Sequence, residues 1–349
     1  VNILIMDEPT SVLTPQEVDQ LFTTLRTLVD DGLTIIFITH KLDEVMQVSD
    51  RVTVLRKGKV VANLITTKTD KPTLAKLMVG REVVFRLKKS PLKQREKLLE
   101  VNDLHVLNDR GLPALRGLSF DLFGGEILGI AGVSGNGQTE LAEVITGLRK
   151  STRGKILLAN KEVTNYSARE MNDLHVAHIP SERIKMGIVP ALSIRENLIL
   201  KKYCRPPFSH REFLNNKAIE DNARCAMSDF QITAPSCETP AKLLSGGNIQ
   251  KVILARELSE RPNLIVAVHP TYGLDIGATE QVRQTLLAQR EQGAATLLIS
   301  EDLEEIMTLS DRILVLFNGE AMGILNTERV DIEQIGLMMA GTRYHKGEE

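Results

Sequence analysis

The sequence predicts an α/β fold built on a parallel sheet, on three observations. An apolar strand, Ile127–Ala131, runs into a glycine-rich turn and then into a helical pattern. A second apolar strand, at residues 1–6, precedes a helical pattern at Gln16–Val29 and a third strand at Thr34–Ile38. Residues 1–80 also recur near the other end of the chain. Apolar strands that alternate with helices are typical of parallel sheets covered on both faces.

The glycine-rich turn at residues 129–140 is similar to a phosphate-binding loop without its lysine. The template G-x-x-x-x-G-K-[ST] matches at Gly132, Gly137 and Thr139, and Gln138 stands where the lysine should be. A charge-assisted hydrogen bond is worth about 1.5–3 kcal/mol and a neutral one about 1 kcal/mol, so the amide is a weaker phosphate ligand. Taken alone, the turn could also be one that holds no phosphate. The candidate nucleotide-binding residues of this loop are Gly132, Ser134, Gly135, Asn136, Gly137, Gln138, Thr139 and Glu140.

Two carboxylates end the first strand. Asp7 would hold Mg²⁺, directly or through water, and Glu8 would polarise the water that attacks a γ-phosphate. His40 follows the strand Thr34–Ile38. The structural alternative for His40 is a histidine whose hydrogen bonds are satisfied at a strand end.

The repeat has an offset of 261 residues and no gap. Segment 2–10 aligns with 263–271, 49–51 with 310–312, and 78–80 with 339–341. We therefore expect a duplicated domain.

The offset predicts a domain organisation. Residues 1–80 would be the C-terminal third of a first domain, 81–97 a charged linker, 98–341 a complete second domain, and 342–349 a tail. The pattern from about 190 to 243 is helical and less regular, which indicates a helical insertion in the second domain. The chain looks like a fragment that begins inside a parallel sheet, so its first strand should expose apolar surface. Further strands are expected at Leu98–Val101, Leu115–Leu122, Lys155–Leu158 and His175–Ile179.

A second diagnostic stretch opens the helix after Leu243. Ser245 is a predicted N-cap, and Gly246, Gly247 and Asn248 follow it. The N–H groups at such a helix start form an anion site without a lysine.

Composition narrows the functional class. The chain has 43 basic and 45 acidic residues, for a net charge of −2, which argues against nucleic-acid binding. Its three cysteines are odd in number and lack metal-ligand spacing, as in a reduced cytoplasmic protein. No apolar run approaches the roughly 20 residues that cross a bilayer, and we see no signal peptide, so a partner would bring the protein to a membrane.

Together these motifs give the chain a family resemblance. The signature Leu244–Lys251 (LSGGNIQK), the Asp-Glu-Pro-Thr of residues 7–10, the Ile-Thr-His of residues 38–40 and the duplication resemble the ATP-binding subunits of ABC importers. The likeness is closest to the double-domain subunits for simple sugars and nucleosides. Residues 109–119 and 125–138 resemble the nucleoside branch in particular.

The resemblance implies a P-loop NTPase fold, and it implies roles for specific residues. ATP and Mg²⁺ would be the cofactors, with Asp7 and Thr139 as metal ligands, Glu8 as the catalytic carboxylate and His40 as the γ-phosphate switch residue. Ser245, Gly246, Gly247 and Asn248 would close over the ATP of the first domain. The protein would lie at the cytoplasmic face of the membrane, bound to transmembrane permease subunits and served indirectly by an extracytoplasmic solute-binding protein.

The second domain departs from the family pattern at its charged positions. By the offset, Val268 replaces Asp7, His269 replaces Glu8 and Glu301 replaces His40. Residues 180–183 (PSER) occupy the glutamine loop, the adenine-stacking aromatic expected near 104–108 is not there, and Thr14 stands at the position of Asp275. These losses predict a second site that binds nucleotide weakly or statically and does not hydrolyse it.

Two other interpretations remain open from the sequence. This chain could be a catalytically inert, nucleotide-responsive regulatory fragment, because it holds no complete P-loop. It could also belong to a soluble tandem ATPase unconnected to transport. By itself, this fragment is expected to show almost no ATPase activity.

Overall fold

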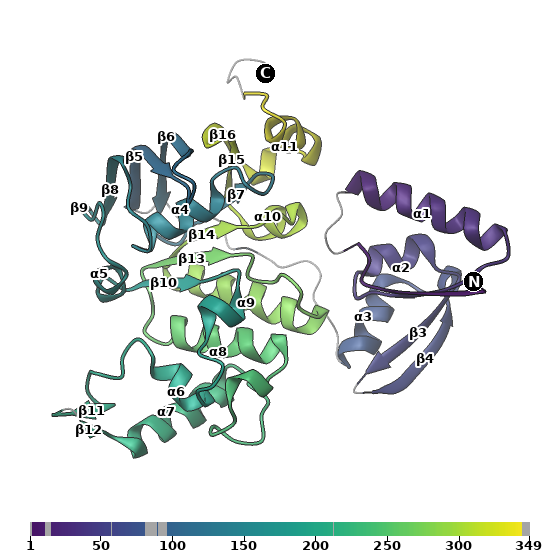
Figure 1. Ribbon diagram of the computed structural model, residues 1–349, viewed down its shortest axis with the longest axis horizontal. Coiled ribbons are helices and arrows are strands. Elements are labelled where there is room, and N and C mark those ends of the chain that lie inside the picture. The colour runs from purple at the N-terminus through teal and green to yellow at the C-terminus, as the bar shows by residue number, and fades with distance from the viewer. Residues whose placement is uncertain are drawn as a thin grey trace. The chain divides into compact units, whose positions relative to one another are not determined.

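The computed structural model describes residues 2–10, 15–56, 58–80, 89, 96–211 and 213–343 (Figure 1). It contains two compact units. Unit 1 comprises Val1–Phe85 with Asp275–Glu280, and unit 2 comprises Arg86–Leu274 with Gln281–Glu349. Thr14 and most of the predicted linker and tail lie outside the described residues.

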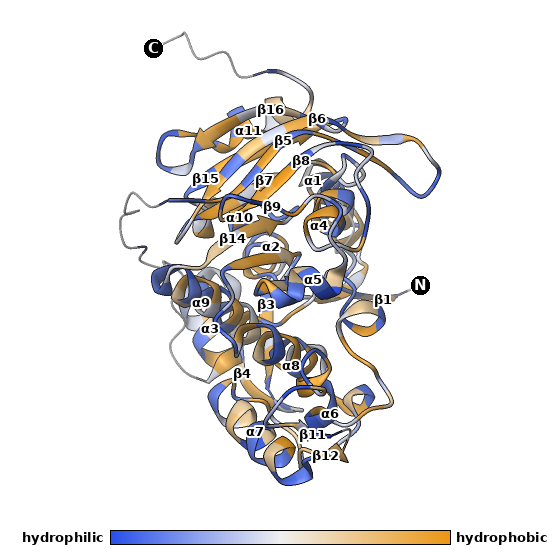
Figure 2. Cartoon of the chain, turned by 90° about the vertical axis from the view of Figure 1, so that its left-hand side faces the viewer, coloured by the Kyte–Doolittle hydropathy of each residue, from blue (hydrophilic) through white to orange (hydrophobic). Residues whose placement is uncertain are grey.

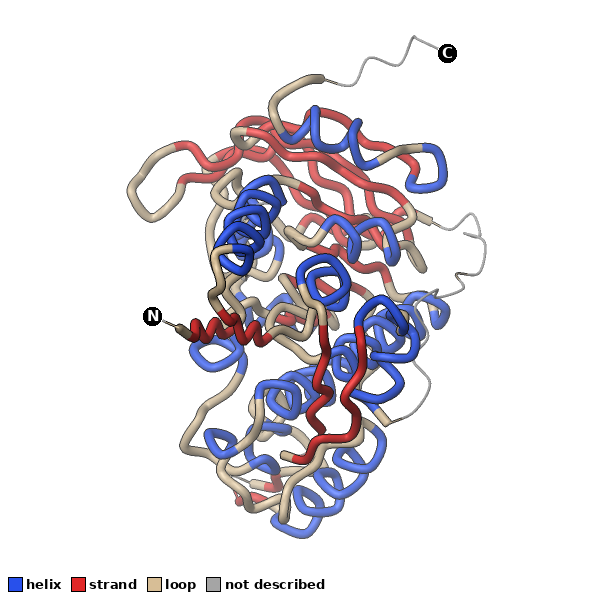
Figure 3. Tube along the Cα trace, turned by 90° about the vertical axis from the view of Figure 1, so that its right-hand side faces the viewer, coloured by secondary structure: helices blue, strands red, loops and turns tan. Residues whose placement is uncertain are grey.

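Unit 1 holds two pairs of strands and the helices that connect them. Its strands are β1 (Ile3–Asp7), β2 (Thr34–Ile38), β3 (Arg51–Arg56) and β4 (Lys59–Ile65), and its helices are α1 (Pro15–Asp30), α2 (Leu42–Val48), η1 (Thr66–Lys68) and α3 (Lys71–Val79). Strands β1 and β2 are parallel, with Asp7 opposite Ile38. Strands β3 and β4 form an antiparallel ribbon, visible as two neighbouring red strands in Figure 3. Leu42, Val54, Leu74 and Ala75 form the buried core of this unit.

Unit 2 is organised around a mostly parallel sheet. Among its described residues, six strands run in the order β10-β13-β14-β7-β15-β16, and only β16 is antiparallel to its neighbour. They are β7 (Ile127–Ala131), β10 (Val176–Ile179), β13 (Leu264–Val268), β14 (Ala295–Ile299), β15 (Arg312–Phe317) and β16 (Glu320–Asn326). Every residue of β7, β13 and β14 is buried, and Figure 2 shows β7 and β14 in the hydrophobic colour. This uniform burial explains why these strands read as unbroken apolar runs.

An antiparallel sheet shares the core of unit 2. Its strands, in the order β6-β5-β8-β9, are β5 (Lys97–Leu107), β6 (Pro113–Phe123), β8 (Arg153–Leu158) and β9 (Lys161–Glu162). Residues from both sheets and from helix α4 (Gln138–Ile145) join in one hydrophobic cluster. The sequence predicted β5, β6 and β8 with shorter limits and did not indicate β9. The prediction for β5 stops at Val101 because the exposed Asn102 and Asp103 interrupt the apolar pattern there.

The remaining elements surround this core. They are α5 (Ala168–Asp173), η2 (Arg183–Gly187), α6 (Ile194–Ile199), β11 (Ser209–His210), β12 (Phe213–Leu214), α7 (Asn216–Asp229), η3 (Ala241–Leu243), α8 (Gly246–Leu258), α9 (Ile276–Gln292), α10 (Leu303–Leu309), η4 (Thr327–Arg329) and α11 (Ile332–Met339). Helix α8 packs on β10, α10 on β7 and α11 on β15. The segment from about 190 to 243 holds α6, α7 and η3, and it also contains the β11–β12 hairpin, which the sequence did not indicate. No helix in the described part of the chain is long and apolar enough to span a bilayer.

The secondary structure of unit 1 recurs in unit 2 at the offset of the sequence repeat. Strands β1, β2, β3 and β4 become β13, β14, β15 and β16 when 261 is added to their limits, without a residue of difference. Helix α2 becomes α10, and η1 becomes η4, in the same way. The sequence patterns that specify these elements are therefore present in both copies, although the residues that follow the strands differ.

Burial is what distinguishes the two copies. Ile3, Ile5, Ile36 and Ile38 of β1 and β2 are 48–64% exposed. Their counterparts in β13 and β14 are buried in the sheet of unit 2. The apolar surface expected on the first strand is thus present, and it extends to β2.

Candidate functional site

A carboxylate and an imidazole meet at one edge of the β1–β2 sheet. Glu8 follows β1, and His40 lies two residues after β2. Glu8 has a φ of 44°, and its N–H donates to the carbonyl of Ile38 over 2.9 Å, which turns the chain out of the strand. Glu8 Oε1 then lies 2.7 Å from His40 Nδ1. The ring of His40 is partly exposed and its Nδ1 has a hydrogen-bond partner, so the contact fits both interpretations of this residue.

Asp7 is the residue that the sequence predicts as a metal ligand in unit 1. It ends β1 with an exposed side chain, next to Glu8, and carboxylate oxygens are ligands that Mg²⁺ prefers. In unit 2 the corresponding residue, Val268, is 5% exposed and offers no ligand. The described residues contain no cluster of three or more acidic, histidine or cysteine side chains that could hold a metal by themselves. An Mg²⁺ ion at Asp7 would therefore need substrate phosphates and water to complete its shell.

The glycine-rich turn joins β7 to α4 and has the shape of a phosphate loop. Gly137 has a φ of 103°, and a Cβ there would lie 2.6 Å from the carbonyl oxygen of Ala114, so only glycine fits. Ser134, Gly135 and Thr139 are exposed at the tip of the turn and the start of α4. Backbone N–H groups at such a helix start attract anions.

Gln138 lies inside this turn. Its side chain is buried, with 7% exposure, and Nε2 donates to the carbonyl oxygen of Val133 over 2.9 Å. Asn136 Nδ2 donates to the same carbonyl over 3.0 Å, and its Oδ1 accepts from the N–H of Asn318 at 2.7 Å. Gln138 thus braces the loop from within, at the position where a lysine would offer a positive charge.

The start of α8 forms the second predicted turn. Ser245 caps the helix as predicted, and its Oγ accepts from the N–H of Asn248 at 3.4 Å. Asn248 Oδ1 also accepts from the N–H of Thr233, so this side chain ties the cap to the preceding loop. The guanidinium of Arg183 lies near Gly246, and burial lowers the pKa of Arg183.

In unit 2 a histidine stands at the position of Glu8 and a glutamate at the position of His40. His269 follows β13 with a φ of 45°, and its N–H donates to the carbonyl of Ile299 over 2.8 Å, as Glu8 does to Ile38. Glu301 follows β14 at the position of His40. Burial lowers the pKa of His269, and the charge of Glu301 opposes that shift only in part. His269 is therefore a neutral imidazole at pH 7, where unit 1 has a carboxylate.

The predicted counterpart of the glutamine loop, residues 180–183, has two exposed side chains. Ser181 and Glu182 are exposed, and Glu182 pairs with Lys185 at 2.9 Å.

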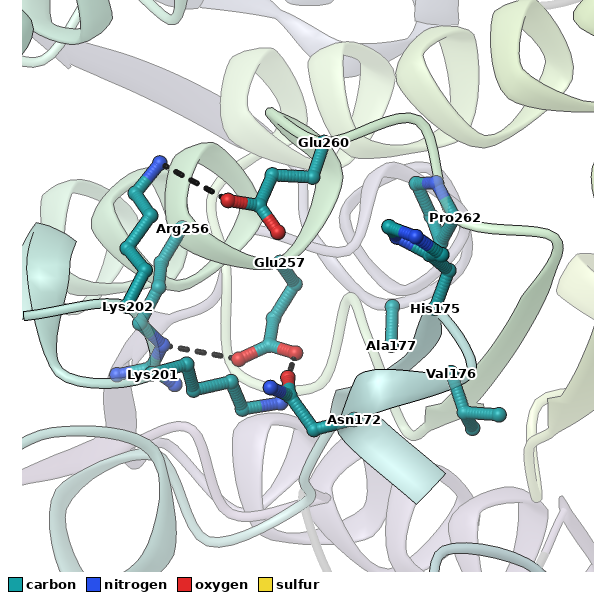
Figure 4. Close-up of a pocket in the computed structure, with 10 residues that line it drawn as sticks. All are labelled: Asn172, His175, Val176, Ala177, Lys201, Lys202, Arg256, Glu257, Glu260 and Pro262. Atoms are coloured by element: carbon teal, nitrogen blue, oxygen red, sulfur yellow. Dashed lines mark hydrogen bonds and ion pairs between the residues drawn. The ribbon is translucent and has the colours of Figure 1, made fainter. Parts of the chain in front are cut away.

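A separate pocket of unit 2 lies beside the amino ends of strands β10 and β13 (Figure 4). It is next to Val176, the first residue of β10, and to Pro262, just before β13. The glycine-rich turn, by contrast, follows the last residue of β7. Ligands of open parallel sheets bind beyond the carboxyl ends of the strands, so this pocket is not the nucleotide site.

Known proteins show what the chain is similar to. The sequence profile of a family described as "ABC transporter" matches residues 115–271. The nucleoside import ATP-binding protein NupA of Lactococcus lactis is 42% identical over 97% of this chain and 67% of its own length. The guanosine import ATP-binding protein NupO of Bacillus subtilis is 44% identical, over 98% of this chain and 67% of its own. The glucose import ATP-binding protein TsgD13 of Haloferax volcanii is 44% identical over 98% of this chain and 62% of its own length. This chain thus spans about two thirds of the length of these relatives.

Solved structures confirm the predicted fold class. A nucleotide-free ATP-binding cassette of an ABC transporter aligns with a TM-score of 0.58 at 21% identity, over 70% of this chain and 96% of its own. A cassette bound to ADP and Pi aligns with a TM-score of 0.56 at 21% identity, over 66% of this chain and 99% of its own.

Proposed function

This chain belongs to the ATP-binding proteins of the ABC transporter family, and we propose that it provides the ATP hydrolysis that drives import of a nucleoside or a simple sugar. The observation that carries this proposal is the contact between Glu8 and His40, 2.7 Å apart at the carboxyl ends of two parallel strands. We favour a nucleoside as the solute because two of the relatives are nucleoside or guanosine import proteins. A simple sugar is the second choice because other relatives are glucose, galactose or ribose import proteins.

In unit 1, each partner of the pair has a distinct role in the proposed reaction. The Glu8 carboxylate orients and polarises the water that attacks the γ-phosphate, and His40 contacts the γ-phosphate oxygens. The contact with His40 restricts the rotamers of Glu8, which keeps its free oxygen in position for water. An Mg²⁺ ion held by Asp7 would neutralise charge that develops on the phosphates.

Unit 2 contributes binding without hydrolysis in this proposal. Its glycine-rich turn and the α8 start, Ser245 to Asn248, offer backbone N–H groups to phosphates. Gln138 offers no positive charge, Val268 offers no metal ligand, and His269 is neutral. Several parts of a phosphoryl-transfer site are thus missing at once, and each can cost orders of magnitude in rate.

The rest of the proposal concerns the assembly. The chain would belong to a duplicated-domain subunit, bound at the cytoplasmic face of the membrane to permease subunits that receive solute from a binding protein. Residues 180–186 and the segment from about 190 to 243 would transmit nucleotide-dependent motion to the permease.

A second candidate function is a nucleotide-responsive regulatory module without turnover. It is favoured by Gln138, which braces the loop of unit 2 with an uncharged side chain.

Reconstitution of the complete protein with its permease in proteoliposomes tests the proposal. ATP hydrolysis and solute uptake should both occur, and both should stop in Glu8→Gln. Asp30→Asn, which alters an exposed acid at the end of α1, should leave both unchanged. ATP turnover that persists in Glu8→Gln would overturn the proposal.

A further inference from the structure

Glu44 is a buried carboxylate of unit 1 to which the proposed chemistry gives no role. It lies on α2 and is 5% exposed. A buried carboxylate costs free energy unless it is hydrogen-bonded, so its partners should explain its presence.

Those partners are the two turns that carry the pair of the proposed active site. Thr10 Oγ1, two residues after Glu8, donates to Glu44 Oε1 over 2.6 Å. Thr39 Oγ1, one residue before His40, donates to Glu44 Oε2 over 2.9 Å. Each oxygen of one carboxylate thus holds one of the two turns.

Lys41 completes the arrangement. Its Nζ lies 3.2 Å from Glu44 Oε1, and its N–H donates to Thr39 Oγ1 over 3.1 Å. Lys41 therefore contacts the same carboxyl group that binds Thr10 and Thr39.

The same frame occurs in unit 2 at the offset of 261. Thr271 Oγ1 donates to Glu305 Oε1 over 2.7 Å, and Ser300 forms a hydrogen bond to the same carboxyl group. Glu305 is 1% exposed, and burial raises its pKa. The position of Lys41 is taken by Asp302, which caps α10 instead. Unit 1 thus places Lys41 in an ion pair with the frame carboxylate, whereas in unit 2 the cation that acts on Glu305 is Arg283, which also pairs with Asp302.

We propose that Glu44 is a positioning residue, which fixes the distance between Glu8 and His40 by tying together the turns that carry them. The inference rests on the proposed function, since the distance matters for rate only if Glu8 and His40 act on ATP. A displacement of about 1 Å in a catalytic group can reduce a rate by about 100-fold. Loosening this frame should therefore lower kcat without an equal change in KM.

The test compares variants of the complete protein in its transporter. Thr10→Val removes one bond to Glu44 and keeps the shape of the side chain, whereas Thr10→Ser keeps the hydroxyl. We expect kcat for ATP hydrolysis to fall at least tenfold in Thr10→Val, with KM within threefold of wild type, and to recover in Thr10→Ser. Glu44→Gln should lower kcat in the same way, because an amide cannot accept from both hydroxyls.

Unit 2 supplies the matched control. Thr271→Val breaks the equivalent bond to Glu305 and should destabilise the fold by a similar amount, but it should leave kcat within twofold of wild type. If Thr271→Val lowers kcat as much as Thr10→Val does, the effect is general destabilisation and the positioning role is wrong.

A second measurement separates the inference from the proposed function. Hydrogen exchange of the Glu8 amide, which donates to Ile38, should accelerate at least tenfold in Thr10→Val and not in Thr10→Ser. If Glu8→Gln stops turnover but Thr10→Val leaves kcat unchanged, the inference fails and the proposed function stands. If Glu8→Gln retains turnover, the proposed function fails, and unchanged exchange of the Glu8 amide in Thr10→Val would overturn the inference as well.

Discussion

Glu8 Oε1 lies 2.7 Å from His40 Nδ1. At the equivalent positions of unit 2 the chain places His269 and Glu301, so the acid and the imidazole have changed places on the same backbone frame. The strand limits, the positive φ after the first strand and the buried Thr–Glu bond agree between the copies. The same backbone arrangement therefore carries a different order of charged and titratable side chains in each unit.

Gln138→Lys should strengthen nucleotide binding to unit 2. A lysine side chain can reach a phosphate from this position, and a charge-assisted bond exceeds a neutral one by about 0.5–2 kcal/mol, or about 2–30-fold in affinity. Titration of this chain with a fluorescent ATP analogue would measure the change. Gln138→Met is the control: it loses the bond to Val133, so unfolding free energy should drop by about 1 kcal/mol without a gain in affinity. An unchanged Kd in Gln138→Lys would show that the loop of unit 2 does not meet phosphate.

His178 should make the stability of unit 2 depend on pH. Burial lowers the pKa of His178 from 6.5 to about 4, and Lys201 and Arg256 add to that shift against Glu257. Between pH 4 and pH 6.5, His178 therefore binds a proton in the unfolded chain but not in the folded chain. The unfolding free energy should therefore be highest above pH 6.5 and fall by roughly 3 kcal/mol as the pH drops to 4.

Urea unfolding followed across this pH range would check that expectation. His178→Gln should flatten the slope between pH 6.5 and 4, and His210→Gln, which changes an exposed histidine, should preserve it. A slope that is the same in His178→Gln and wild type would exclude His178 as its source.

Glu257 should be a strong contributor to the stability of unit 2. Its side chain is 1% exposed and accepts from Lys201 at 2.5 Å and from Arg256 Nε at 2.9 Å (Figure 4). It also accepts from the backbone N–H of His178 at 3.0 Å. Burial acts to raise the pKa of Glu257, but the two cations outweigh it and the pKa is lowered. Removing one member of such a buried pair costs about 3 kcal/mol, because Arg256 is left without its partner.

Glu257→Gln should therefore lower the unfolding free energy by about that amount in chemical denaturation. Glu260→Gln is a matched control in the same pocket: this acid is 48% exposed and 3.9 Å from Lys202, so its loss should cost less than about 1 kcal/mol. Equal effects of the two substitutions would mean that Glu257 is solvated in the native state.

Much of this architecture follows from the sequence, for reasons that differ among elements. Strand β7 was predicted to the residue because all five of its side chains are buried, and Ser245 was predicted as a cap because its chemistry is local. Glu44 and Glu257 were not singled out, since their partners lie in other elements and their burial depends on tertiary packing. The spacing shared by Glu44 and Glu305 was a signal that the repeat contained. Gln138 was recognised as a missing lysine, but its bond to Val133 depends on how the turn folds.

The most direct test of the account compares phosphate release by the complete protein in its transporter for Glu8→Gln and His269→Gln. We predict that Glu8→Gln lowers the rate at least about 100-fold, since it removes the catalytic carboxylate, while His269→Gln keeps at least half of it. Equal losses in the two variants, or turnover that persists in Glu8→Gln, would contradict the assignment of hydrolysis to the carboxylate and imidazole of unit 1.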